Sequence, residues 1–186
     1  MAPPEKRPAT YDDLLELPDY RVGEIVEGEL YSSPRPSLRH ATTSSVLGHL
    51  LIGPFQLGSD GPGGWSIVDE PEIHFGKNVL VPDLAGWRRE RLAGLDFDEN
   101  RITIVPDWIC EVLSPPTARL DRIRKMRIYA RGGVEFAWLI DPKLRSVETF
   151  RREADGWTTA GEYQENERMR AAPFEVVEID LSILWA

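Results

Sequence analysis

The chain has 186 residues, of which 41% are hydrophobic, and its 22 basic and 31 acidic side chains give a net charge of −9. The apolar content excludes a disordered chain, and no run approaches the roughly 18 consecutive apolar residues that a membrane span needs. The negative charge argues against tight binding of nucleic acid over the whole surface, because such binding depends on Lys and Arg that displace counterions from phosphates. A local basic patch would still permit it.

The length and the N-terminus set the expected organisation. A chain of this length fits one domain, and we expect residues 1–186 to form it, with the proline-containing residues 1–9 as an extended or disordered arm. The N-terminal residues lack the apolar stretch of a secretory signal, and the single cysteine, Cys110, has no partner for an internal disulfide. We therefore expect a cytoplasmic protein without a membrane attachment.

The first half of the chain predicts a short helix, a strand, a long helix and two further strands. Thr10 can cap the short helix, which Pro18 ends, and Gly28 interrupts the first strand at a turn or bulge. The long helix has apolar residues at positions 46, 47, 50 and 51, the spacing of one buried face. In chain order, the expected ranges are a helix at 12–17, a strand at 25–31, a helix at 40–57, and strands at 65–75 and 79–86.

The second half predicts a strand, a helix and a second strand, followed by a hairpin. A proline-containing break separates the first strand from the helix, and Gly132 and Gly133 end that helix. This order predicts an α/β fold whose mixed sheet contains at least one parallel crossover. The expected ranges are a connection with a helical turn at 88–100, a strand at 108–113, a helix at 119–131, a strand at 134–140, a hairpin of 146–151 with 157–163, and a closing segment at 174–185.

Two carboxylates conflict with their apolar surroundings. Asp83 follows the run VLVP and, on the two-residue period of a strand, shares a face with Val79 and Val81. Glu111 is the only charge in WICEVL, a run typical of a strand buried on both faces. A buried carboxylate costs several kcal/mol unless it is paired or binds a cation. On neighbouring strands the two predict a site for Mg²⁺ or Mn²⁺, although each taken singly can instead accept hydrogen bonds from a following turn.

The helix expected at 119–131 carries the cationic candidates. Lys125 lies well off the stripe that the arginines form at spacings of three and four, so we expect it to turn toward the sheet. There its amino group can orient or deprotonate a water and stabilise charge on a phosphate; an ordinary lysine at the edge of the face is the alternative. The arginines either contact nucleic-acid phosphates or form a solvated face balanced by acids; they are Arg119, Arg122, Arg124, Arg127 and Arg131.

Several segments stand in a characteristic order: EIVEGEL (24–30), PRPSLRH (34–40), VPDLAGW (81–87), PDWICEVLSPPT (106–117) and RLDRIRKMRIYARGGVEFAWLIDP (119–142). Together they resemble the Uma-two family of restriction endonucleases, within the PD-(D/E)XK nuclease superfamily, over roughly residues 20–150. The most specific part is EVLSPPT, followed by the helix with Lys125 and by GGVEFAWLIDP. The resemblance implies a restriction-endonuclease-like core, a four-stranded mixed sheet flanked by helices, to which the C-terminal antiparallel strands are added.

The resemblance also implies a metal-dependent phosphodiesterase centre. It makes Asp83 the first acidic ligand and Glu111 the second. The lysine that ordinarily follows two positions later is here Leu113, and Lys125 on the next helix takes its place. Two accessory residues are implied by the same motifs, with a surface strand position and a capping or packing role as their respective alternatives: Glu24 and His40.

The leading hypothesis is an endonuclease that hydrolyses DNA phosphodiester bonds with Mg²⁺ or Mn²⁺ held by Asp83 and Glu111, and with a water positioned by Lys125. An alternative, which the net charge favours, is a nuclease fold kept as a binding or assembly module without catalysis. Acid–base hydrolysis by the same two carboxylates without a metal is a third. A homodimer is a further hypothesis, based on aromatic residues that can pack either across two chains or within one: Trp157, Phe174 and Trp185.

Overall fold

The computed structural model describes residues 7–96, 98, 101–154 and 156–185. Most of the arm expected at residues 1–9 lies outside these ranges. Its last part is held in place, since Arg7 forms an ion pair with Asp13 at 2.6 Å and the Ala9 N–H donates to the Gly28 carbonyl at 2.8 Å. Residues 7–9 are therefore an anchored extended segment.

A central sheet of six strands has the order β10-β9-β8-β7-β6-β3. The pair β7 and β8 is parallel and the other neighbours are antiparallel, which confirms the predicted mixed sheet with a parallel crossover. The sheet exceeds the four strands that the resemblance implied, because the β9–β10 hairpin extends one edge. The strands are β3 (Trp65–Asp69), β6 (Leu84–Arg88), β7 (Trp108–Val112), β8 (Phe136–Asp141), β9 (Ser146–Glu153) and β10 (Gly156–Gln164).

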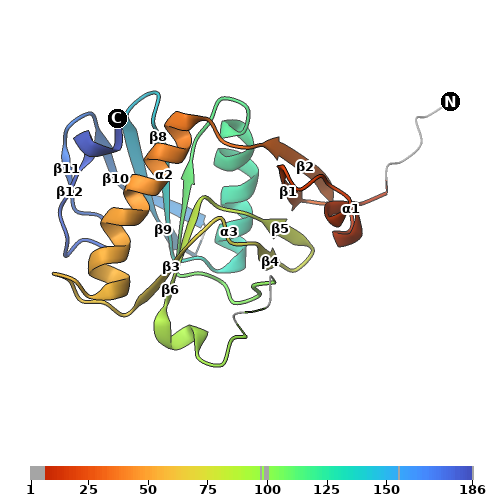
Figure 1. Cartoon of the computed structure of the whole chain (residues 1–186), viewed down its shortest axis with the longest axis horizontal. Helices are drawn as coiled ribbons and strands as arrows, with labels where there is room; N and C mark the ends of the chain where they lie inside the picture. Colours follow the sequence, from red (N-terminus) through yellow and green to blue (C-terminus); the bar gives the residue numbers. More distant parts are fainter. Residues whose placement is uncertain (1–6, 97, 99–100, 155, 186) are drawn as a thin grey trace.

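A smaller sheet lies beside the central one, at the right of Figure 1, and has the order β2-β1-β5-β4. Its first two strands form a hairpin around Glu27 and Gly28, whose φ angles of 52° and 81° are both positive. Glycine tolerates such angles at no steric cost, and this confirms the turn predicted at Gly28. The strands are β1 (Arg21–Val26), β2 (Glu29–Pro34), β4 (Ile73–Phe75) and β5 (Asn78–Leu80), and the short helix α1 (Tyr11–Leu15) contacts β1.

Two short connections, from β3 to β4 and from β5 to β6, cross directly between the two sheets. The strands expected at 65–75 and 79–86 are each split, with one part in the central sheet and the other in the small sheet. Pro71 and Pro82 stand at the two breaks. Because proline has no N–H to donate to a strand ladder, it interrupts a run that is otherwise apolar enough to continue.

The two crossings lie side by side, since the Glu70 N–H donates to the Asp83 carbonyl at 3.1 Å. Asp83 therefore lies in the connection between β5 and β6. The expectation that Asp83 shares a strand face with Val79 and Val81 is wrong, because the strand ends at Leu80. The separation of the two sheets at this point opens the space in which the candidate site lies.

Helices cover both faces of the central sheet. Helix α2 (Leu38–Leu51) and its π-helical continuation η1 (Ile52–Leu57) pack on one face, and η3 (Leu120–Lys125) with α3 (Met126–Gly132) packs on the other (Figure 1). Both helices were predicted within a few residues. The remaining elements are η2 (Arg89–Leu92), β11 (Arg168–Met169), β12 (Ile179–Asp180) and η4 (Leu181–Trp185).

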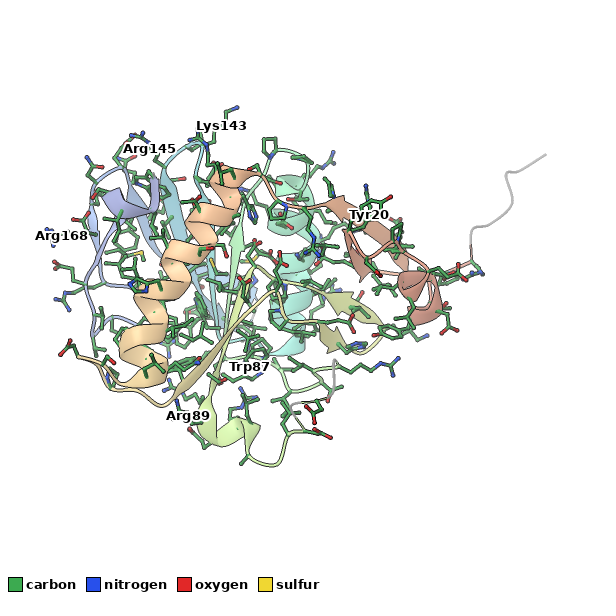
Figure 2. The ribbon with its side chains drawn as sticks, in the orientation of Figure 1. Tyr20, Trp87, Arg89, Lys143, Arg145 and Arg168 are labelled. Atoms are coloured by element: carbon green, nitrogen blue, oxygen red, sulfur yellow. The ribbon has the colours of Figure 1, made fainter. Side chains whose placement is uncertain are left out.

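The C-terminal segment closes the face that carries α2. Phe174 and Trp185 are buried within the chain, and Trp157 donates its indole N–H to the Met126 carbonyl at 2.7 Å. The aromatic residues that suggested a homodimer thus pack within one chain and give it no support. Arg168, labelled in Figure 2, lies at the end of the molecule opposite the small sheet. Within the described ranges, no helix is long and apolar enough to cross a membrane.

Candidate active site

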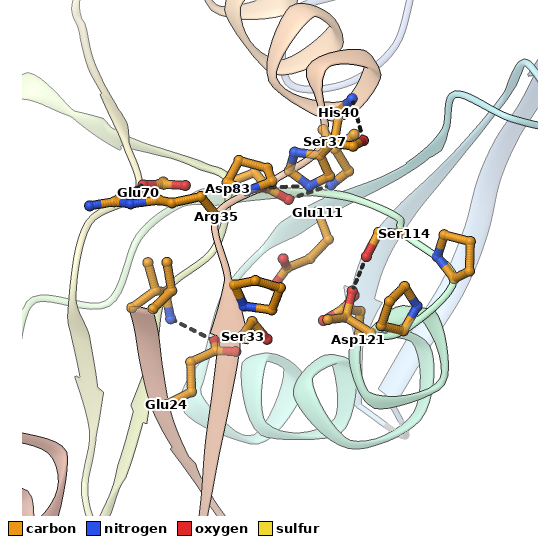
Figure 3. Close-up of a pocket in the computed structure, with 18 of the residues that line it drawn as sticks. Glu24, Ser33, Arg35, Ser37, His40, Glu70, Asp83, Glu111, Ser114 and Asp121 are labelled. Carbon is orange, nitrogen blue, oxygen red and sulfur yellow. Dashed lines mark hydrogen bonds and ion pairs between the residues drawn. The ribbon is translucent and has the colours of Figure 1, made fainter. Parts of the chain in front are cut away.

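A cavity of about 350 Å³ lies where the two sheets separate, between the start of α2, the end of β7 and the start of η3 (Figure 3). Its wall is strongly acidic, and the cations beside it are few. The carboxylates that line it are Glu24, Glu70, Asp83, Glu111 and Asp121. The basic side chains that line it are Arg35, His40 and Lys125.

Asp83 joins three parts of the fold at this cavity. Its Oδ2 accepts the backbone N–H of Val112 at 2.6 Å, and its Oδ1 lies 3.2 Å from Nε2 of His40 in the first turn of α2. Burial alone lowers the pKa of His40, but its hydrogen bond with Asp83 and the aspartate charge outweigh burial and raise that pKa. His40 therefore lines the cavity, where its imidazole contacts Asp83.

Glu111 is the carboxylate most deeply buried in the wall, with 3% of its side chain exposed near the end of β7. Its Oε1 accepts a hydrogen bond from the Tyr129 hydroxyl at 2.5 Å and lies 2.9 Å from Nζ of Lys125. Burial raises the pKa of Glu111 well above its usual range in spite of the neighbouring ammonium. The prediction that Glu111 is a buried charge within a strand is confirmed.

Lys125 turns inward, with 3% of its side chain exposed, as its position off the arginine stripe predicted. Its Nζ lies 2.7 Å from Glu24, 2.9 Å from Glu111 and 3.5 Å from Asp121, and it also approaches the Val81 carbonyl at 3.4 Å. Burial lowers the pKa of Lys125, but the charges of Glu111 and Glu24 outweigh it and hold that pKa well above its usual range. An ammonium donates three hydrogen bonds, so these oxygens account for all its donors.

Glu24 belongs to the same cluster. It lies on β1 with 8% exposure, and its Oε1 accepts the Val81 N–H at 2.8 Å in addition to contacting Lys125. The alternative of a surface strand position is therefore wrong for Glu24. The hydrogen bond holds the segment 81–83, and with it Asp83, against the small sheet.

Sequence reasoning missed two residues on the inner face of the same helix. Asp121 and Tyr129 stand four residues before and after Lys125, a spacing that places all three side chains on one face. Burial raises the pKa of Asp121, and burial together with the charge of Glu111 raises that of Tyr129 well above its usual range. The spacing of four is the signal in the sequence that associates Asp121 and Tyr129 with Lys125.

Two further residues at the mouth of the cavity were also missed. Glu70 precedes the proline at the first crossing, and burial and then the charges of Asp69 and Asp83 raise its pKa. Arg35 lies between two prolines in the loop after β2, with its Nη1 3.8 Å from Glu70 and 62% of its side chain exposed. Nothing in the sequence placed this loop beside Asp83.

The donor chemistry of the wall fits a hard cation. Glu70 and Glu111 both have raised pKa values, to which neighbouring negative charges contribute, and a divalent ion would relieve that repulsion. Among the residues that the structure describes, no group of three His, Cys, Asp or Glu side chains is arranged to hold a metal by itself. Mg²⁺ does not require such a cage, since it is usually held by one or two carboxylates together with waters and substrate phosphates.

The five arginines predicted to contact nucleic acid do not line this cavity. Arg124 contacts Glu27 and Glu29, each at 2.8 Å, and Arg127 lies 3.7 Å from Glu27. Arg122 pairs with Glu148. The part of the chain that the structure describes contains no ion pair for the other two, Arg119 and Arg131.

Comparisons with known proteins agree with this architecture. No curated protein matches the chain. A solved structure of a "putative nuclease" belonging to DUF820, from Anabaena variabilis, is similar with a TM-score of 0.78 and 22% sequence identity, over 96% of this chain and 98% of that one. At this identity the likeness establishes the shared fold. The family model Uma2, described as "Putative restriction endonuclease", matches residues 8–183, and the chain therefore belongs to the Uma2 family.

Proposed function

We propose that this protein is a metal-dependent nuclease that hydrolyses phosphodiester bonds of DNA. The observation that carries the proposal is the meeting of Asp83 and Glu111 in one cavity beside the buried Lys125. Membership of the Uma2 family supports a nuclease, and the restriction-endonuclease-like fold supplies a suitable scaffold. Fold alone does not establish activity, which depends on the chemistry of the cavity.

The charge of the cavity supports metal dependence. Five carboxylates in one wall repel a phosphodiester, and Lys125 already donates to protein oxygens. A substrate phosphate therefore needs an additional cation to enter. Asp83 and Glu111 would hold Mg²⁺ or Mn²⁺, and the ion would supply a more acidic water and relief of the phosphate's charge.

The side chains around the two ligands prepare them for this role. His40 orients Asp83 through Oδ1, and the Val112 N–H fixes Oδ2. Lys125 balances part of the charge of Glu111 and Glu24, so we assign it a positioning role in place of direct contact with a water. Arg35 is exposed at the mouth and is the cation placed to meet the phosphate first.

The outer face of the η3–α3 helix supplies candidate contacts to DNA phosphates. Arg119 and Arg131 are both exposed and are the best placed, because no described acid neutralises them. The other three arginines already have carboxylate partners, which weakens their attraction for a phosphate. They are Arg122, Arg124 and Arg127.

A cleavage assay tests the proposed function. Supercoiled plasmid, linear duplex and single strands are incubated with the native chain and Mg²⁺ or Mn²⁺, beside Asp83→Asn and Glu111→Gln. We expect cleavage that requires metal and is lost in both variants, and that is retained in Glu178→Gln, whose carboxylate pairs with Arg168 far from the cavity. Cleavage that survives both substitutions, or no cleavage of any substrate, would contradict the proposal.

A binding module without catalysis is the second candidate. It is favoured by the engagement of both oxygens of Asp83, by Val112 and His40, which leaves this carboxylate less free to bind a metal. For this candidate we expect salt-sensitive binding of nucleic acid without cleavage, and equal metal binding by the native chain and both variants. The same samples, assayed by filter binding, distinguish the two functions.

A further inference from the structure

The two oxygens of Glu111 have different surroundings. Oε1 accepts the Tyr129 hydroxyl at 2.5 Å and lies 2.9 Å from Nζ of Lys125. Among the residues that the structure describes, none donates a hydrogen bond to Oε2, and Glu111 lines the cavity. The carboxylate thus has one oxygen occupied by the protein and one left for a ligand.

Tyr129 is the more selective of the two donors. The ammonium of Lys125 is shared among Glu24, Glu111 and Asp121, so its position depends on all three. The Tyr129 hydroxyl donates a single hydrogen bond, and its ring is fully buried and packs edge-on against Phe75, with centroids 5.6 Å apart and planes at 73°. The ring cannot move without disturbing this packing, and its hydroxyl therefore defines where Oε1 lies.

Such an anchor is needed because the terminal torsion of a glutamate is soft. The last χ angle of Glu has a broad distribution, so a carboxylate held at one point can rotate either oxygen toward a cation. Two donors on the same oxygen remove that freedom. A ligand fixed in advance binds its metal more tightly, since less conformational freedom is lost on binding.

We propose that Tyr129 is a positioning residue that holds Oε1 of Glu111 inside the protein and thereby presents Oε2 to the metal. The inference depends on the proposed metal site, but it does not depend on the reaction that follows. It adds to the proposed metal site a residue that contacts neither the cation nor the substrate. It also predicts that Glu111 binds the metal through one oxygen.

Tyr129→Phe tests the inference with the least change, because the ring and its packing on Phe75 remain. Binding of Mn²⁺ to the full chain is measured by electron paramagnetic resonance, and the specific site is the one that Glu111→Gln lacks. We expect Tyr129→Phe to raise the dissociation constant of this site about 10–100-fold, the usual effect of losing a hydrogen bond to a metal ligand. Tyr163→Phe is the matched control, since its hydroxyl donates to the Arg170 carbonyl at 3.2 Å outside the cavity.

The outcomes separate this inference from the nuclease proposal. Weaker Mn²⁺ binding in Tyr129→Phe, with thermal unfolding and Tyr163→Phe both near native, supports it, and raising the Mn²⁺ concentration is then expected to restore any cleavage. A native dissociation constant in a folded Tyr129→Phe overturns it. A native chain that binds Mn²⁺ at this site but cleaves nothing contradicts the nuclease alone, and one without the site overturns both.

A measurement on the native chain keeps the test valid if the variant does not fold. With tyrosine-labelled protein, the hydroxyl proton of Tyr129 is followed by NMR during titration with Mg²⁺, which is diamagnetic. We expect a slowly exchanging proton whose signal persists when the metal is bound. Loss of that signal on binding would mean that the metal takes Oε1 and displaces Tyr129, which overturns the inference.

Discussion

The inner and outer faces of the η3–α3 helix carry the same kinds of ion pair in opposite environments. On the inner face, Lys125 and Glu111 each have 3% of their side chains exposed and lie 2.9 Å apart. On the outer face, Arg127 and Glu27 are 50% and 34% exposed and lie 3.7 Å apart. Water screens the outer pair, whereas the inner charges are removed from water and depend on one another and on hydrogen bonds from the protein. The difference shows that the helix contributes its buried face to the site and its exposed face to the surface.

The two faces also differ in how their charges are balanced, and this affects how the net charge of the protein should be interpreted. The net charge of −9 is not spread evenly, because three of the helix arginines already have acidic partners on the surface, while five carboxylates gather in the cavity. Lys125 offsets only part of that concentration. The overall charge therefore says little about affinity for a phosphate, which depends on the cations at the mouth and on any bound metal.

Replacement of Lys125, the buried cation, is expected to have the largest effect on stability. Lys125→Met leaves buried carboxylates without their ammonium, which typically costs about 3–5 kcal/mol of unfolding free energy. At about 2–4 °C per kcal/mol, calorimetry should show a fall in Tm of about 6–20 °C. Arg127→Met on the outer face is the control, with an expected loss below about 1 kcal/mol. Equal losses in the two variants would show that the faces do not differ as described.

An intermediate loss of unfolding free energy is expected on replacing Arg124, the outer arginine with the most contacts. It reaches Glu27 and Glu29 and lies over the ring of Tyr31, 5.4 Å from its centroid, and so ties the helix to the β1–β2 hairpin. For Arg124→Ala we expect a loss of about 1–2 kcal/mol, because a network with a cation–π contact exceeds a single exposed pair. Urea denaturation measures it. A loss as large as that of Lys125→Met would place this network among the buried pairs.

Replacement of Asp121, whose pKa is raised by burial, is expected to increase stability, by less than the losses described above. An acid with a higher pKa in the folded state favours folding when protonated, and this contribution is lost as pH rises through the folded pKa. Asp121→Asn should therefore raise Tm relative to the native chain near neutral pH, and the gain should vanish below the ordinary aspartate value of 3.8. Thermal scans between about pH 3 and pH 8 test this sign. A gain that is independent of pH would contradict it.

The smallest effect on stability is expected where no ion pair is lost. Arg119→Ala combined with Arg131→Ala should change the unfolding free energy by less than about 0.5 kcal/mol. If both contact DNA phosphates, the slope of log affinity against log salt should fall by about 1 for each contact. Filter binding at several salt concentrations measures the slope, with Arg168→Ala, at the far end of the molecule, as control (Figure 2). An unchanged slope would remove these arginines from the DNA interface.

Much of the site could be predicted because its residues conflict with their local pattern. Glu111 is the one charge in an apolar run and is buried in β7, and Lys125 lies off the arginine stripe and turns inward. Local periodicity is sufficient for both, since a strand and a helix each fix the direction of their side chains. The mixed sheet and its parallel crossover follow from the order of strand, helix and strand along the chain.

The positions of the other residues around the cavity depend on how the two sheets separate, and no local sequence pattern predicts that separation. Asp83 lines the cavity but was expected on a strand, because its apolar neighbours outweighed the break at Pro82. Arg35 and Glu70 reach the cavity only because the loop after β2 and the first crossing meet there. Tyr129 carries no local signal of a polar role, since a tyrosine between apolar residues is usually part of the core, and its hydrogen bond to Glu111 joins a helix to a strand.

The most direct test of the account is to locate the cation. Crystals grown with Mn²⁺ are measured at its absorption edge, where anomalous scattering identifies the ion. We predict a peak in the cavity beside Asp83 and Oε2 of Glu111, with Tyr129 still bonded to Oε1. A cavity without a peak in crystals that hold Mn²⁺ elsewhere, or a peak away from both carboxylates, would contradict the central claim that these two residues form a metal site.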